Sequence, residues 1–148
     1  MVKAAVVAHL NKLVEQRIRS LKDELANTLQ ARNSDTKSSA GDKHEVGRAM
    51  VQQELDQLEA QLTKSQAMQQ ELARVPLDRG YELVAFGSLV RTDQGDYFMA
   101  IGLGAVECDG ETCYAISLAS PIGKALKDKR VGDAIDFNGK QITVQMIQ

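Results

Sequence analysis

The first part of the chain shows a helical pattern of apolar positions, which recur at spacings of three and four residues. The series consists of Val7, Leu10, Val14, Ile18, Leu21, Leu25 and Thr28. This spacing places the apolar side chains on one face of an α-helix, with charged side chains on the opposite face. Neither glycine nor proline occurs before Gly41. The pattern therefore predicts an uninterrupted helix from about Val2 to about Arg32.

A second helical series alternates between spacings of four and three residues. It consists of Val51, Leu55, Leu58, Leu62, Ser65, Gln69 and Leu72. We expect this helix to begin near Asp42 and to end before Pro76, because the residue that precedes a proline avoids helical geometry. The segment 33–42 between the two helices is polar and turn-prone.

Two such helices are expected to pack against each other. Each would have about 30 residues and a length of about 45 Å, and neither would be stable in water unless its apolar face were buried. The pattern therefore predicts an antiparallel coiled-coil hairpin over residues 1–75, with a tip loop at 33–42.

From residue 76 onward the pattern becomes typical of β-strands. Strands are expected over residues 81–90, 97–106, 114–118, 134–137 and 141–147. Asn138-Gly139 is a strong signal for a two-residue hairpin turn. Ser120 and Pro121 are expected to begin a short helix, with serine as the N-cap and proline at the first helical position. Residues 76–148 thus form a small antiparallel β domain with one short helix, and the fold class of the whole chain is α+β.

Composition and charge narrow the possible functions. The length of 148 residues suits one or two small domains. The net charge of −2 argues against a general nucleic-acid-binding protein. No apolar run approaches the ~20 residues that span a bilayer, and the first residues do not resemble a signal peptide. We expect a cytoplasmic protein without membrane contact, either a monomer or a weak dimer.

Two cysteines, Cys108 and Cys113, are separated by the turn-prone tetrapeptide Asp-Gly-Glu-Thr. Thiols of a cytosolic protein stay reduced. A structural zinc site would need about four ligands, and the sequence holds no second pair of cysteines. We therefore expect two thiols that flank a turn.

An acidic pair, Asp42 and Glu45, stands at the expected start of the second helix. An Asp N-cap followed three residues later by Glu resembles a capping box. Residues three apart on a helix project from the same side. On spacing alone, the pair is interpreted as a helix cap with a favourable dipole interaction.

Two stretches of the chain resemble the Gre transcript-cleavage factors of bacteria. The first runs from Ile116 to Leu126 and on through Lys129-Arg130-Val131-Gly132-Asp133, combining a Ser-Pro helix start, a lysine and a Val-Gly-Asp turn. The second, Gly41-Asp42-Lys43-His44-Glu45, is similar to the tip pattern Gly-Asp-Leu-Lys-Glu of that family. The tip loop is longer here, and Val46-Gly47-Arg48-Ala49 replaces the usual Asn-Ala-Glu-Tyr. The chain thus resembles a divergent member of the family.

This resemblance implies both a fold and a function. The β domain would be FKBP-like, and the hairpin would enter the secondary channel of bacterial RNA polymerase. There Asp42 and Glu45 would form the catalytic tip and help to hold a Mg²⁺ ion shared with the polymerase, since Mg²⁺ prefers hard carboxylate oxygens. Ser120 and Pro121 would lie in the polymerase-binding region. The protein would be an accessory factor, not an enzyme, because the polymerase itself cuts the backtracked RNA.

Three alternatives stay open at this point. The protein could occupy the secondary channel without stimulating cleavage, or it could be a coiled-coil scaffold or dimerisation module. Ser120 and Pro121 could be no more than an ordinary helix cap. A prolyl isomerase, which an FKBP-like domain can suggest, is disfavoured because only 4% of the residues are aromatic.

Overall fold

The computed structural model describes the backbone of residues 1–35 and 42–148, and the side chains of residues 1–33 and 47–148. The chain forms two compact units. One unit consists of Lys12–Gln69, and the other combines Met1–Asn11 with Gln70–Gln148. The first turns of the N-terminal helix therefore belong with the sheet. In the described residues, no helix has a stretch that is long and apolar enough to cross a membrane.

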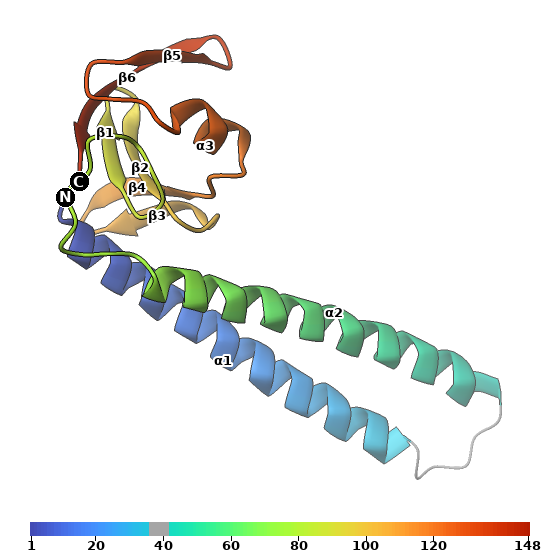
Figure 1. The fold of residues 1–148 in the computed structure, drawn as a ribbon. Helices are drawn as coiled ribbons and strands as arrows, with labels where there is room; N and C mark the ends of the chain where they lie inside the picture. Colours follow the sequence, from blue (N-terminus) through green and yellow to red (C-terminus); the bar gives the residue numbers. More distant parts are fainter. Residues whose placement is uncertain (36–41) are drawn as a thin grey trace. The chain divides into compact units, whose positions relative to one another are not determined.

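The unit Lys12–Gln69 is a helical hairpin, in which α1 (Lys3–Asp35) and α2 (Asp42–Ala73) run side by side (Figure 1). The buried positions of this unit follow the predicted apolar series and are Val14, Ile18, Leu21, Leu55, Leu58 and Ser65. Gln69 is exposed instead, because a carboxamide is costly to bury without a hydrogen-bond partner. Apolar burial along both helices thus holds the hairpin together, as the spacing predicts.

The second unit contains a six-stranded sheet and one short helix, α3 (Pro121–Leu126). The strands are β1 (Leu89–Thr92), β2 (Gly95–Met99), β3 (Gly104–Cys108), β4 (Glu111–Ile116), β5 (Ala134–Phe137) and β6 (Lys140–Ile147). Their order across the sheet is β3-β4-β2-β1-β6-β5 (Figure 1). A helical hairpin followed by this sheet confirms the α+β fold class.

One strand pair of the sheet departs from the antiparallel prediction, because β2 and β4 are parallel. Residues 97–106 do not form one strand. The chain leaves β2 after Met99, continues to β3 at the edge of the sheet, and returns through a tight turn at Asp109-Gly110. Since β3 and β4 form an antiparallel hairpin, β4 re-enters between β3 and β2 in the same direction as β2.

The predicted strand over 81–90 is wrong for residues 81–88, which form turns and bends. Backbone hydrogen bonds link Val84 to the segment after α3, from Val84 N to Lys129 O (2.9 Å) and from Asp128 N to Val84 O (2.9 Å). Gly87 has a φ of +86°, and a Cβ there would lie 2.8 Å from the Tyr81 hydroxyl. Distant partners and a left-handed glycine therefore override the local preference for a strand.

The core of the second unit lies between the sheet and α3. It consists of Val84, Val90, Met99, Leu126, Ile135, Ile142 and Val144. Phe98 is the largest of the fully buried side chains. Val6 and Leu10, from the first turns of α1, are also fully buried. The N-terminal turns are thus an integral part of this unit.

Candidate functional site

The acidic pair stands at the start of α2, which begins at Asp42. Glu45 follows in the same first turn of helix, so the backbone places the two residues on one side. Their side chains lie outside the described residues. At 1.5 Å per residue, the 32 residues of α2 span about 48 Å. The pair therefore lies at the opposite end of α2 from the residues that belong to the sheet unit.

Close to this end, a polar bridge joins the two helices. Arg32 Nη1 of α1 donates a hydrogen bond to Gln52 Oε1 of α2 (3.2 Å), and Gln52 Nε2 donates to Asp56 Oδ1 (3.0 Å). Gln52 follows Glu45 by seven residues, which is about 10 Å of helical rise. The bridge is exposed and contributes little to stability. It shows that the helices stay paired to within about two turns of the acidic pair.

Side chains that could bind a metal ion are not clustered in the described parts of the chain, where no group of three or more His, Cys, Asp and Glu residues is placed to hold one. Cys108 and Cys113 are free and buried, and burial raises the pKa of the Cys113 thiol to about 12. Two carboxylates on one helical turn suit a Mg²⁺ ion that takes its other ligands from elsewhere.

Ser120 caps α3, as predicted from the Ser-Pro pair. Its Oγ accepts a hydrogen bond from Gly123 N (3.1 Å) and donates one to Ser117 O (2.6 Å). The hydroxyl is therefore engaged within the cap. Ser120 is half-buried, whereas Pro121 at the first helical position is exposed, so Pro121 is the more accessible residue of the pair.

Gly123 allows α3 to lie close to the segment before it. A Cβ at this position would collide with Ser117 O and would lie 3.0 Å from Leu118 Cα. We expect Gly123→Ala to lower the free energy of unfolding by about 1–3 kcal/mol, since overpacking displaces backbone. Urea denaturation measures this change.

The matched control for this substitution is Gly47→Ala. Gly47 lies in α2, and a Cβ there has no neighbour within 4 Å. The control should be neutral or stabilising by up to about 1 kcal/mol, because alanine has the higher helix propensity. If Gly123→Ala were as stable as Gly47→Ala, the result would contradict the close approach of the backbone at Gly123.

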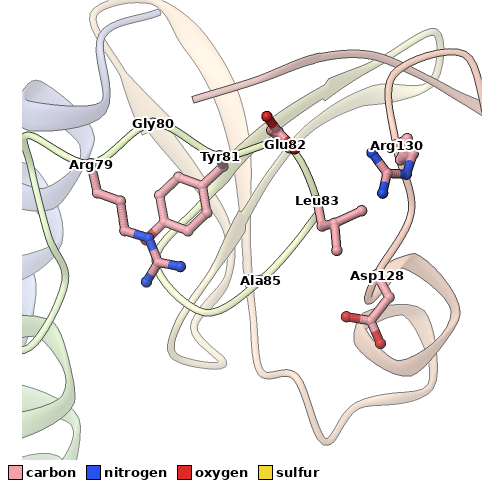
Figure 2. A pocket seen from close by; sticks show the side chains of 8 residues that line it. All are labelled: Arg79, Gly80, Tyr81, Glu82, Leu83, Ala85, Asp128 and Arg130. Carbon is pink, nitrogen blue, oxygen red and sulfur yellow. The ribbon is translucent and has the colours of Figure 1, made fainter.

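A further hollow of about 440 Å³ lies in the sheet unit, beside the segment 79–85 (Figure 2). Arg79 and Tyr81 line one side, and Asp128 and Arg130 line the other. The Tyr81 ring contacts two cations. The Arg79 Cζ lies 5.0 Å from its centroid, and the buried Lys3 Nζ lies 4.6 Å away. Both distances are typical of cation–π interactions.

Lys3 is the unusual member of this cluster. Its side chain is buried, and its Nζ has no hydrogen-bond partner among the described residues. One feature of the sequence indicates that Lys3 is buried: it lies four residues before Val7, and therefore on the apolar face of the helix. Burial lowers the pKa of the Lys3 amine, and the Arg79 guanidinium lowers it further, whereas Asp78 raises it.

This lowered pKa predicts a pH dependence of stability. Between the lowered pKa and the ordinary value of 10.5, the unfolded chain binds more protons than the folded protein. The contribution of Lys3 to the free energy of unfolding should therefore rise with pH across this interval and stay constant below it. The raised pKa of the Cys113 thiol acts in the opposite direction above its ordinary value of 9.0, so the quantity to measure is the difference in free energy of unfolding between wild type and Lys3→Met, from urea denaturation at increasing pH. This difference should shift in favour of the wild type as the pH rises. Lys12→Met, at an exposed position of the same helix, should show no such shift, and a difference between wild type and Lys3→Met that did not change with pH would contradict the assignment.

The fold and the tip together define a class: an α+β protein with a long helical hairpin, a mostly antiparallel sheet and an acidic pair where the second helix begins. Among solved structures, the chain is similar to that of the transcription factor Gfh1. The two are 22% identical, the match covers 93% of this chain and 92% of that chain, and the TM-score is 0.37. No protein-family model matches the chain, and neither does any curated protein.

Proposed function

We propose that this protein is an accessory factor of bacterial RNA polymerase that stimulates the cleavage of backtracked RNA. One observation carries the proposal: Asp42 and Glu45 fall in the first turn of α2, where the Gre-like pattern of residues 41–45 requires an acidic pair. The hairpin would enter the secondary channel of the polymerase with this end first. The protein would act in the cytoplasm and would meet nascent RNA only through the polymerase.

The tip residues suit this role chemically. A Mg²⁺ ion held there together with polymerase ligands would supply Lewis acidity to phosphodiester hydrolysis. Asp42 would bind the ion, and Glu45 would either bind it or orient the attacking water. Neither residue needs to hold the ion stably in the free protein, because Mg²⁺ sites often rest on one or two protein carboxylates.

The β unit would supply the docking contact. Pro121 is exposed at the start of α3, whereas the Ser120 hydroxyl is engaged in the helix cap. We therefore assign the contact with polymerase to Pro121, and the shape of the surrounding surface to Ser120. Both residues belong to the Gre-like stretch that runs from Ile116 to Leu126.

The decisive experiment uses a stalled, backtracked complex of bacterial RNA polymerase with labelled RNA. Addition of the protein should shorten the transcript in the presence of Mg²⁺, and co-sedimentation should show binding to the polymerase. Binding without shortening would leave the second candidate, a channel-occupying regulator, which the altered residues Val46-Gly47-Arg48-Ala49 favour. Absence of binding would refute both and leave a scaffold role.

A further inference from the structure

Aromatic residues are scarce in this chain, yet three of the six line one hollow of about 270 Å³ in the sheet unit. They are Tyr97 of β2, Tyr114 of β4 and Phe137 at the end of β5. Tyr97 and Tyr114 are direct neighbours across the parallel strand pair. Their rings stack with centroids 5.4 Å apart and an interplanar angle of 30°. The hollow is thus built around a stacked tyrosine pair.

The stack is held in place and yet accessible. Tyr114 is 37% exposed, which is high for an aromatic ring. Gly95 in β2 has a φ of +121°, and a Cβ there would lie 3.1 Å from Tyr114 Cε2. The absence of a side chain at Gly95 therefore lets the Tyr114 ring lie against the backbone. The Tyr97 hydroxyl is protonated at neutral pH and can donate a hydrogen bond, and burial together with the neighbouring Tyr114 raises its pKa further.

The rim of the hollow carries three exposed polar side chains, those of Gln94, Asn138 and Lys140. Within the described part of the chain, none of the three has a hydrogen-bond or ion-pair partner. Lys140 is the only charged residue of the lining. Asp93 and Asp96 are engaged, since Asp93 accepts from Thr143 N (2.8 Å) and Asp96 pairs with Arg91 (3.3 Å). Asp136, the carboxylate nearest to Lys140 in sequence, lies outside the lining and forms no ion pair with Lys140 in the described structure. The rim therefore combines two free carboxamides with an unneutralised cation.

We propose that this hollow binds a nucleotide, with its base against the tyrosine stack and its phosphate at Lys140. Exposed aromatic rings on a sheet are a general platform for bases, and carboxamides can hydrogen-bond base edges in both directions. A proline-rich peptide also binds aromatic grooves, but it gives the unpaired cation no partner. A single cation on a chain of net charge −2 suits one nucleotide and not a long polyanion. The inference is independent of the proposed polymerase role.

The experiment is an NMR titration of the full chain, observed at the side-chain amides of Gln94 and Asn138. The probes are nucleoside 5′-monophosphates, the matching nucleosides, inorganic phosphate, a 5′-phosphorylated oligoribonucleotide and a proline-rich peptide. Monophosphates should shift both amides and bind more tightly than the nucleosides. The same shifts with the oligoribonucleotide would also support the proposal. If the monophosphate binds more tightly, the natural ligand is a free nucleotide; if the oligoribonucleotide binds more tightly, it is the end of an RNA strand.

Variants test the assigned contacts. Tyr114→Ala should weaken binding by about 10-fold or more through lost stacking, whereas Tyr114→Phe should bind almost normally. Lys140→Gln should weaken the monophosphate by about 3- to 5-fold, the scale of an exposed ion pair, and leave the nucleoside unaffected. Lys127→Gln, at an exposed lysine outside the lining, is the matched control.

Several outcomes would overturn the proposal. They are no shift with any monophosphate at millimolar concentration, identical shifts with inorganic phosphate alone, or shifts with the proline-rich peptide only. Equal losses in Lys140→Gln and Lys127→Gln would also overturn it, because the effect would then be one of net charge. Circular dichroism of Tyr114→Ala checks that the sheet is intact. If it is not, Lys140→Gln, at an exposed position of the rim, still tests the proposal.

Discussion

Replacement of Asp42 by Asn together with Glu45 by Gln is expected to abolish transcript cleavage without loss of polymerase binding. Both substitutions preserve size and remove charge, so the hairpin should stay folded while its affinity for Mg²⁺ falls. A loss of roughly 100-fold or more in cleavage rate is expected. Loss of a metal ligand should cost at least as much as loss of a neighbouring residue that only holds such a ligand in position. The measurement is the rate of RNA shortening in a backtracked complex, beside co-sedimentation with polymerase.

The chain supplies a closely matched control for this double substitution. Asp56 and Glu59 have the same residue types, order and spacing as the tip pair, on the same helix, and both are exposed. Asp56→Asn with Glu59→Gln should leave cleavage unchanged. If both double variants lost activity equally, overall charge and not the tip would be responsible. If the tip variant kept full activity, the pair would be a helix cap and nothing more.

Replacement of Phe98 by alanine is expected to have the largest effect on stability. Phe98 is fully buried, and it lies in register with Leu89 on one side and Ala115 on the other. Loss of a buried phenylalanine side chain costs about 3–5 kcal/mol. Because small domains are stable by only about 5–15 kcal/mol in total, this variant should be partly unfolded or close to it. Urea denaturation followed by near-ultraviolet circular dichroism measures the loss.

Phe98→Leu is the control for this substitution, since it keeps most of the apolar volume. It should cost less than about 1.5 kcal/mol, which is typical of substitutions that nearly conserve volume. A similar loss in both variants would mean that the shape of the ring matters more than the cavity. A loss below about 1 kcal/mol in the alanine variant would contradict the packing of β2 between β1 and β4.

The two long helices were predictable because their stability depends on spacing along one chain. The expected helix from Val2 to Arg32 is observed as Lys3–Asp35, and the last hairpin turn at Asn138-Gly139 is found where the dipeptide predicts it. The segment 81–88 was not predictable in this way, because the backbone partners of Val84 at its centre lie more than forty residues away, at Asp128 and Lys129. Strand order is likewise absent from local periodicity, which explains the unexpected parallel pair.

The candidate sites differ in the same respect. The cap formed by Ser120 uses neighbours within three residues, so the Ser-Pro signal was sufficient. The aromatic hollow joins residues from β2, β4 and the β5–β6 turn, which only the folded sheet brings together. A low aromatic content argues against such a site only when the rings are dispersed. The role of the tip pair stays a prediction, because it depends on a partner.

The assignment of Met1–Asn11 to the sheet unit has a consequence for the order of events during synthesis. These residues leave the ribosome before the hairpin, whereas β6, which pairs with β1, follows the other strands. The hairpin residues Lys12–Gln69 find their partners early, but Val6 and Leu10 have no complete core to enter until β6 is made. Newly made chains should therefore expose this apolar surface to chaperones until β6 has left the ribosome.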